Sequence, residues 1–377
     1  MHAAAQGLHP SALHYDPDMP DAHALARSLP KVLLHEHLDG SLRVATLFEL
    51  LRERGLQVAD DIPGLALWFE RRAHAGSLTT YLQGFALTVE AMASPTALER
   101  VAFEAAEDAL EDGCVLAEFR IAPLLFEAHG LAGEAVVEAL LAGLARSALP
   151  SGLIVCSMRH LPEGESQRAA RLALRYQGSG VVGFDLAGAE AGHPPGDHAS
   201  ALALCRDAGL ALTLHAGEAD VAERVVDAMH LGARRVGHGV RLVDALQDPE
   251  RRALVDEVLA GDIHLEVCPT SNVHTGAAAS IPEHPITALW RAGLSLSYHT
   301  DNRLMSRITH SSEATALLQH TPLYLADLLS MGREAARHSF LGATARAAAT
   351  AHIDAWGASH DPLAQQPPLH LTPPRSR

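Results

Sequence analysis

Residues 31–37 read KVLLHEH, a short apolar run that ends in two histidines on either side of a glutamate. Similar runs, apolar and then polar or glycine-rich, recur along the 377-residue chain. The eight runs are KVLLHEH (31–37), CVLAEFRIAP (114–123), LIVCSMRH (153–160), VVGFDLAG (181–188), LALTLHAGE (210–218), RVGHG (235–239), IHLEVCPTSN (263–272) and LSLSYHTDN (294–302). Short, bounded apolar runs of this kind are typical of buried strands.

Alanine- and leucine-rich segments with helical spacing separate these runs, for example LAGEAVVEALLAGLARSA after the second and AERVVDAMHLGA after the fifth. Strands that alternate with helices are typical of a parallel sheet. Eight such units predict an α/β fold, a closed (β/α)8 TIM barrel, with additional helices at the carboxyl end. Because barrels of this class commonly reach ~250 residues or more as one unit, we expect a single domain over residues 26–356.

The first two runs are 76 residues apart, and the sequence between them has helical spacing. We predict that residues 41–112 form a helical insertion over the carboxyl-terminal mouth of the barrel, where loops build active sites. We expect residues 1–25 and the proline-rich residues 357–377 to be loosely attached tails.

The composition excludes several classes of partner. A formal net charge of −16 argues against nucleic acid and against a membrane surface, because both attract basic patches. The N-terminal residues lack the basic and apolar regions of a signal peptide, and the four cysteines form no C-x-x-C motif. We therefore expect a cytoplasmic protein without disulfides. Nothing in the sequence indicates its oligomeric state.

Several polar residues fall at or just after the carboxyl ends of the predicted strands. The chain has 24 histidines, so a pair such as His35 and His37 can occur by chance and is weak evidence for a metal site on its own. A barrel, however, would bring strand ends from across the chain to one rim, where polar groups are typical of catalysis. Three imidazoles and a carboxylate suit Zn2+, which lowers the pKa of a bound water towards neutrality. The residues in question are His35, His37, His215, His238, His299 and Asp301.

Two rim residues have alternative interpretations. Glu218, in HAGE, is either a general acid in an enclosed site or an acidic residue that complements a helix N-terminus. His238, between two glycines, could orient the nucleophilic water, bind the metal, or pack the rim.

At these residues the sequence resembles the adenosine deaminase family of the amidohydrolase superfamily. Six strings carry the resemblance, in family order, over residues 29 to about 342: LPKVLLHEHLDGSLR, GFDLAGAE, HAGE, GHG, CPTSN and HTDN. The resemblance implies one Zn2+ per chain. Its implied ligands are His35, His37, His215 and Asp301.

The resemblance also implies catalytic and substrate-binding roles. Glu218 would protonate purine N1, His238 would orient the hydroxide, and Asp301 would accept a hydrogen bond from the attacking water. Hydroxide addition at C6 and loss of ammonia then leave a 6-oxo purine. The substrate contacts are His37, Asp39 (a ribose hydroxyl), the backbone N–H of Gly188 (N3) and Asn302 (N7), with Ser271 and Asn272 shaping the rim.

Lysine usage excludes one variant of the superfamily. Binuclear members commonly bridge two metals with a modified lysine after the fourth strand. The only lysine here is Lys31, at the start of the first strand. A lysine-bridged binuclear centre therefore cannot form.

The sequence departs from the family pattern in HTDN, where His299 stands in place of Asn and Asn302 in place of a second Asp. An Asn at 302 can still donate an N–H to purine N7. His299, with the long insertion, is expected to decide which nucleoside fits. Arginines at 43, 71, 72 and 303 could meet a carboxylated 5′ extension, or stay solvated.

Adenosine is the default substrate, and 6-aminodeoxyfutalosine, which has such an extension, is the alternative. Adenine is less expected because Asp39 stands where adenine deaminases usually have Glu. Outside this chemistry, a metal-dependent amide or phosphoester hydrolase and a non-catalytic purine-binding protein remain open.

Overall fold

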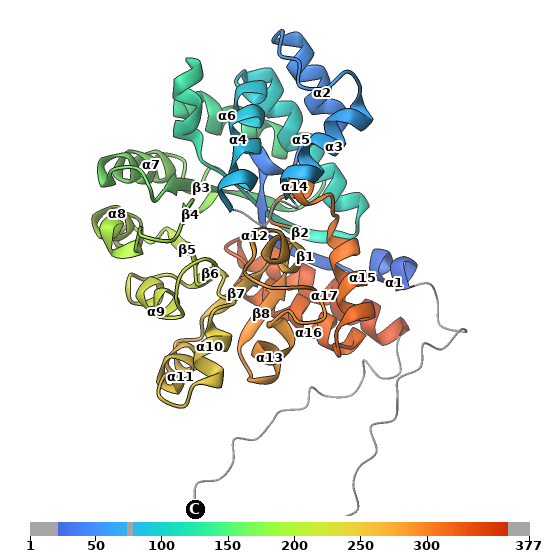
Figure 1. Ribbon diagram of the computed structural model, residues 1–377, viewed down its shortest axis with the longest axis vertical. Helices are drawn as coiled ribbons and strands as arrows, with labels where there is room; N and C mark the ends of the chain where they lie inside the picture. Colours follow the sequence, from blue (N-terminus) through green and yellow to red (C-terminus); the bar gives the residue numbers. More distant parts are fainter. Residues whose placement is uncertain (1–21, 74–77, 361–377) are drawn as a thin grey trace, which may run out of the picture.

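The computed structural model describes residues 22–73 and 78–360 of the chain (Figure 1). Most of the two expected tails, residues 1–21 and 361–377, lies outside these ranges. Helix α1 (Ala22–Ser28) begins the described part, and helix α17 (Ala343–His360) ends it. None of the helices in these ranges is long and apolar enough to cross a bilayer.

Within the described residues, eight parallel strands form one sheet in the order of the sequence. The strands are β1 (Lys31–His37), β2 (Cys114–Ile121), β3 (Ser151–Met158), β4 (Val181–Ala187), β5 (Ala211–Ala216), β6 (Arg235–His238), β7 (His264–Val267) and β8 (Ser295–Tyr298). A parallel bridge between Glu36 and Asp301 joins β1 to the segment after β8. The predicted (β/α)8 barrel is thereby confirmed.

Helices follow the strands, and strand side chains such as Leu34, Phe119 and Leu214 are fully buried beneath them. The remaining elements are η1 (Leu38–Gly40), α2 (Val44–Glu53), α3 (Ile62–Ala73), α4 (Leu78–Met92), α5 (Pro95–Glu111), η2 (Pro123–His129), α6 (Gly133–Leu144), α7 (Glu163–Arg175), η3 (Pro195–His198), α8 (Ala199–Asp207), α9 (Glu223–His230), α10 (Leu242–Gln247), α11 (Arg252–Ala260), α12 (Pro269–Thr275), α13 (Ile286–Arg291), α14 (Arg303–Ser306), α15 (His310–His320) and α16 (Leu325–His338).

The seventh apolar run supplies both a short strand and the start of a helix. β7 ends at Val267, and the CPTSN string turns directly into α12. Pro269 explains this boundary, because proline lacks the N–H that a strand ladder needs and is well suited to the first turn of a helix. The side chains of Ser271 and Asn272 are consequently presented by a helix at the barrel mouth.

The segment between β1 and β2 is helical, as predicted, and consists of η1 and α2–α5. Figure 1 shows α2 and α3 at the outer end of this group. Helix α4 packs against η1 and α12, and the ring centroid of its Phe85 lies 6.4 Å from that of His37. The insertion therefore covers part of the barrel mouth.

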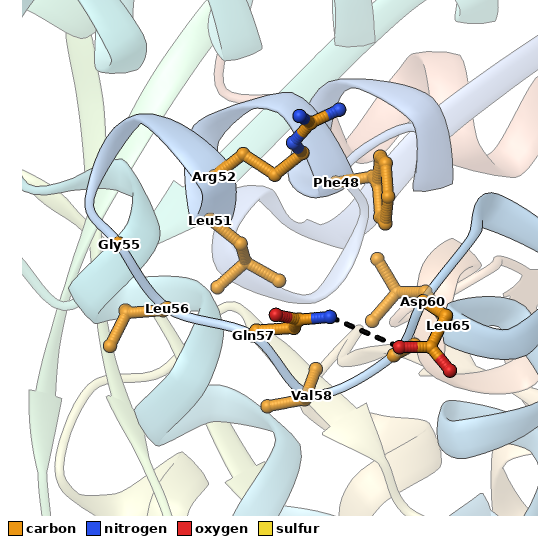
Figure 2. Close-up of a pocket in the computed structure, with 10 residues that line it drawn as sticks. Phe48, Leu51, Arg52, Gly55, Leu56, Gln57, Val58, Asp60 and Leu65 are labelled. Carbon is orange, nitrogen blue, oxygen red and sulfur yellow. Dashed lines mark hydrogen bonds between the residues drawn. The ribbon is translucent and has the colours of Figure 1, made fainter.

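A cavity of about 380 Å3 lies at the outer end of the insertion, between α2 and the loop to α3 (Figure 2). Phe48, Leu51 and Leu65 supply apolar walls, and Gln57 donates a hydrogen bond to Asp60 at 3.0 Å. No strand residue lines it. This cavity is separate from the barrel mouth.

Lys31 has a structural position. Its Nζ donates to the carbonyl oxygens of Ala26 at 2.8 Å and Leu29 at 2.7 Å, at the end of α1. Burial lowers the pKa of this ammonium group. The single lysine thus ties α1 to the amino-terminal end of β1, far along the strand from its histidines.

Candidate active site and metal centre

Polar side chains from separate strands converge at the carboxyl ends of β1, β5, β6 and β8. One ligand atom each of His35, His215, His238 and Asp301 lies within 4.8 Å of the other three. His37 also belongs here, because its Nε2 is 3.2 Å from His215 Nε2 and 3.5 Å from Asp301 Oδ1. The structure therefore brings together all four residues expected to bind metal.

Behind the histidines lies a backing layer, which we define as Arg120, Asp185 and Glu266. His35 Nδ1 is 2.8 Å from Glu266 Oε2, and His215 Nδ1 is 3.0 Å from an Asp185 oxygen. Because ionised carboxylates only accept, each ring carries its proton on Nδ1 and leaves Nε2 directed at the cluster. Arg120 bridges the layer, with contacts of 2.8 Å to Asp185 and 2.7 Å to Glu266.

The backing layer keeps its carboxyl groups charged although they are fully buried. Burial alone would raise both pKa values, but neighbouring cations outweigh it. His215 and Arg120 hold the pKa of Asp185 below its ordinary value, and Arg120 with Arg235 holds that of Glu266 well below. The two carboxylates can therefore orient the imidazoles at any physiological pH.

The donor set fits a metal ion. His35 Nε2 is buried and has no hydrogen-bond partner among the described residues. Burial lowers the pKa of His37 well below its ordinary value, so this imidazole is neutral. Burial opposes charge on Asp301 as well, but the histidines around it, His35 first, hold its pKa well below the usual range. Neutral imidazoles with a carboxylate are ligands that Zn2+ accepts.

Hydrogen bonds fix both the backbone and the side chain of Asp301. Its N–H donates to the carbonyl of His35 at 2.9 Å, and its own carbonyl accepts from His37 N–H at 2.8 Å. Its φ is 57°, in the left-handed region that non-glycine residues rarely adopt and that is enriched at functional sites. Ser271 Oγ donates to Asp301 Oδ2 at 2.5 Å. The barrel closure itself therefore orients the carboxylate.

His238 also has a left-handed backbone, with a φ of 64°. Its neighbour Gly237 is required by packing, because a Cβ there would lie 2.9 Å from Cε1 of His35. The absence of a side chain lets the His35 ring lie against β6. Glycine at 237 therefore allows the His35 ring to approach the backbone of β6 closely.

Glu218 is enclosed, with a side chain 12% exposed. Its Oε1 accepts hydrogen bonds from Asn272 Nδ2 at 3.1 Å and Thr275 Oγ1 at 2.8 Å, while Oε2 lies 3.5 Å from His238 Nε2. Helix α9 begins only at Glu223. The carboxyl group therefore faces α12 and the cluster, and it does not cap the following helix.

The loop that carries Glu218 is held by Glu190, a residue to which the sequence analysis gave no role. The Glu190 carboxylate is buried and accepts four backbone N–H groups at 2.5 to 3.1 Å. These N–H groups belong to Gly217, Glu218, Ala219 and Asp220. Glu190 therefore fixes the turn that separates the ligand His215 from Glu218.

The expected substrate contacts lie at the mouth. Asp39 is buried, its Oδ1 has no partner among the described residues, and burial raises its pKa to about 7. Asn302 Oδ1 likewise has no partner there, and it lies where a Cβ on Gly40 would be. Gly188 follows β4 with a φ of 95°. Unsatisfied buried polar atoms at a site entrance are candidate contacts for a ligand.

His299 does not reach the mouth, contrary to our expectation that it would help to decide which nucleoside fits. Its side chain is fully buried, with Nδ1 accepting from Leu34 N–H at 3.2 Å and Nε2 lying 2.7 Å from Ser297 Oγ. Residue 299 points inward because it immediately follows β8 and keeps the alternation of that strand. His299 is a satisfied core residue.

Two of the arginines considered for a substrate carboxylate are already paired. Arg303 contacts Glu36 at 2.9 Å and Asp108 at 3.0 Å, and Arg43 contacts Asp108 at 2.6 Å. Arg72 lies over the ring of Trp68, 3.4 Å from its centroid. These contacts involve three of the four arginines named in the sequence analysis, and two of the three are ion pairs.

A sequence model of the adenosine deaminase family matches residues 30–356. The chain belongs to the adenosine deaminase family. The adenosine deaminase of Mycobacterium ulcerans (strain Agy99) is 43% identical over 319 residues, which are 80% of this chain and 87% of that protein. Membership identifies the chain as a hydrolytic aminohydrolase and supports deamination of a purine.

Two solved structures have the same fold. The adenine deaminase of Arthrobacter aurescens superposes with a TM-score of 0.79 at 22% identity, over 88% of this chain and 100% of that one. An amidohydrolase from Burkholderia ambifaria with bound Zn also gives a TM-score of 0.79, at 23% identity over 90% of this chain and 95% of that one. At this identity the similarity establishes the barrel alone.

Proposed function

We propose that this protein deaminates adenosine to inosine and ammonia, with one Zn2+ held by His35, His37, His215 and Asp301. The observation that carries the proposal is the convergence of these ligands with Glu218 in a chain 43% identical to an adenosine deaminase. Zn2+ in such a site lowers the pKa of bound water to about 7 and so supplies hydroxide at physiological pH.

The protein's own residues would position and protonate the purine. Two donors, Asn272 and Thr275, occupy Oε1 of Glu218, so Oε2 is the oxygen free to carry the proton that purine N1 receives. Protonation of N1 would make C6 electrophilic, so that water adds its oxygen there and its proton restores Glu218. The C6–N bond would then break as the proton of the added hydroxyl group passes to the amino group, which leaves as ammonia. The balance is one water consumed for one ammonia released.

Asp39, Gly188 and Asn302 would bind the nucleoside. The unpartnered Oδ1 of Asp39 suits a ribose hydroxyl, the backbone N–H of Gly188 suits purine N3, and an Asn302 amide N–H suits N7. Together these three groups match the hydrogen-bonding atoms of a purine nucleoside. A cytoplasmic location stays a prediction.

The arginine contacts favour adenosine over 6-aminodeoxyfutalosine. A carboxylated 5′ extension needs a cation, but Arg43 and Arg303 are bound to Asp108 and Glu36. Freeing either would leave a buried or half-buried carboxylate without its partner, which is costly.

Ammonia release from adenosine, 6-aminodeoxyfutalosine and adenine tests the proposal. We expect adenosine to have the highest kcat/KM, and Glu218→Gln to lower its kcat about 10²- to 10⁴-fold, the usual contribution of a general acid. Gln at 218 keeps the hydrogen bonds to Oε1, so bound metal should be unchanged. A Glu218→Gln variant with most of its activity would favour another metal-dependent hydrolase; inactivity of the zinc-loaded wild type on all three would refute deamination.

A further inference from the structure

We propose that His284 is a positioning residue for the active site and acts through the side-chain amide of Asn272. His284 lies in the loop between α12 and α13, outside every motif of the sequence analysis, and its ring is 4% exposed. The inference rests on the aminohydrolase function proposed above, because its effect is exerted on Glu218 and His238.

A backbone N–H group fixes the tautomer of His284. The N–H of Ile286 lies 3.1 Å from His284 Nδ1. A backbone N–H can only donate, so Nδ1 must be unprotonated and the ring proton must be on Nε2. Burial lowers the pKa of His284 to about 3, so the ring is neutral.

The same logic orients the amide of Asn272. His284 Nε2 lies 3.3 Å from Asn272 Oδ1. Because Nε2 carries the proton, it donates, and the amide oxygen must face His284. The amide nitrogen then faces the site, where it lies 3.1 Å from both Glu218 Oε1 and His238 Nδ1. A reversed amide would set its oxygen against the Glu218 carboxylate and lose that bond, and it would face His238 Nδ1 as an acceptor instead of a donor.

The last link concerns His238. Asn272 donates to His238 Nδ1, so this nitrogen carries no proton and the ring proton is on Nε2. This nitrogen is the one 3.5 Å from Glu218 Oε2. The backbone N–H of Ile286, at the start of α13, therefore sets the tautomer of His238. Its influence passes through three hydrogen bonds, by way of His284 and Asn272, and leaves the His238 proton on Nε2 beside the reacting groups.

The surroundings of His284 provide a matched control. His284 and Thr287 both line a cavity of about 490 Å3 beside α13. Thr287 Oγ1 is buried and has no hydrogen-bond partner among the described residues. Thr287→Val therefore changes the same cavity wall without touching the hydrogen-bond chain.

The experiment compares wild type, His284→Leu, His284→Gln and Thr287→Val, with kcat and KM for adenosine, bound zinc and thermal midpoint as readouts. We expect His284→Leu to lower kcat about 10- to 100-fold, as loss of an outer-shell partner commonly does, with KM and zinc content close to those of Thr287→Val. Gln can accept from Ile286 and donate to Asn272, so His284→Gln should recover most of that loss. In an Asn272→Ala background, the effect of His284→Leu should disappear.

A His284→Leu enzyme with wild-type kcat would overturn the inference, as would Gln and Leu variants with equal losses or an undiminished Leu effect in the Asn272→Ala background. If His284→Leu does not fold, His284→Met, which fills the space with a flexible side chain and has no N–H, takes its place. Wild-type activity on adenosine separates the two proposals: an inactive wild type refutes the function, whereas an active wild type with an unaffected His284→Leu refutes only the positioning role.

Discussion

Buried carboxyl groups occur in two contrasting environments around the site. In the backing layer, Asp185 and Glu266 are bound by Arg120 and histidine nitrogens, and their pKa values lie below the usual range. Asp39, at the mouth, and Glu313, in α15, each leave one oxygen without a partner in the described structure, and burial raises both pKa values to about 7. We refer to Asp39 and Glu313 as the under-paired carboxyls.

The difference shows which half of the site the fold completes by itself. A buried charge is stable only when it is paired and hydrogen-bonded, and the backing layer meets that requirement with its own residues. The under-paired carboxyls do not, so their ionisation depends on pH and, for Asp39, on a bound ligand. The metal half of the site is thus fully built, whereas the substrate half retains unsatisfied groups.

Removal of the Arg120 guanidinium group, the cation of the backing layer, should have the largest effect on stability. Arg120→Met leaves two carboxylates buried without their shared partner, and we expect a loss of about 3–5 kcal/mol in the free energy of unfolding. Urea denaturation of the zinc-free protein measures it. The control is Arg175→Met, at an exposed pair with Glu134, where the expected change is below about 1 kcal/mol. Equal changes in the two variants would contradict the distinction.

Glu313 offers a test in the opposite direction. Its Oε1 accepts from Thr270 N–H at 3.2 Å, and its pKa is raised from 4.5 to about 7 by burial. Between these values the unfolded chain releases the proton and the folded chain keeps it, so stability falls as pH rises and levels off above pH 7. Glu313→Gln should remove this fall, which amounts to about 3–4 kcal/mol at 1.36 kcal/mol per pKa unit.

Urea midpoints at pH 4.5 and pH 8 give that comparison. The variant and wild type should be similar at the lower pH, and the variant should be the more stable at the higher pH. A variant that is less stable than wild type at pH 8 would show that the Glu313 carboxylate has a partner after all.

The smallest expected effect is on substrate binding. Asp39→Asn keeps the shape but removes the charge, and a charged hydrogen bond to a hydroxyl should be worth about tenfold in kcat/KM for adenosine. Deoxyadenosines that lack the 2′, 3′ or 5′ hydroxyl identify the contact, because the analogue without it should show no loss. Bound zinc should not change. An equal loss with all three analogues would place the effect of Asp39 elsewhere.

The fold and the composition of the cluster were predictable from sequence for one physical reason. Apolar runs mark buried parallel strands, and the carboxyl ends of such strands meet at one rim. The sequence alone therefore predicts that His35, His215 and Asp301 lie close together. The end of β7 at Val267 also agrees with a sequence signal, because Pro269 favours the first turn of a helix over continued strand pairing.

The supporting residues were not predicted. Arg120, Asp185 and Glu266 are charged residues inside otherwise apolar strands, and that contradiction was the available signal for a buried ion network. Glu190 and His284 left no such signal, because their contacts depend on loop conformations that periodicity does not encode. His299 was misplaced for the reverse reason: its position at a strand end suggested the rim, but its side chain points inward.

The most direct test of the account is a zinc titration of chelator-treated protein with ammonia release from adenosine as the readout. The account predicts no activity without metal, a linear rise, and saturation at about one zinc per chain, since the described residues place this ligand set at the barrel mouth once. Activity in the metal-free protein, or saturation only at two zinc ions per chain, would contradict a mononuclear site at His35, His37, His215 and Asp301.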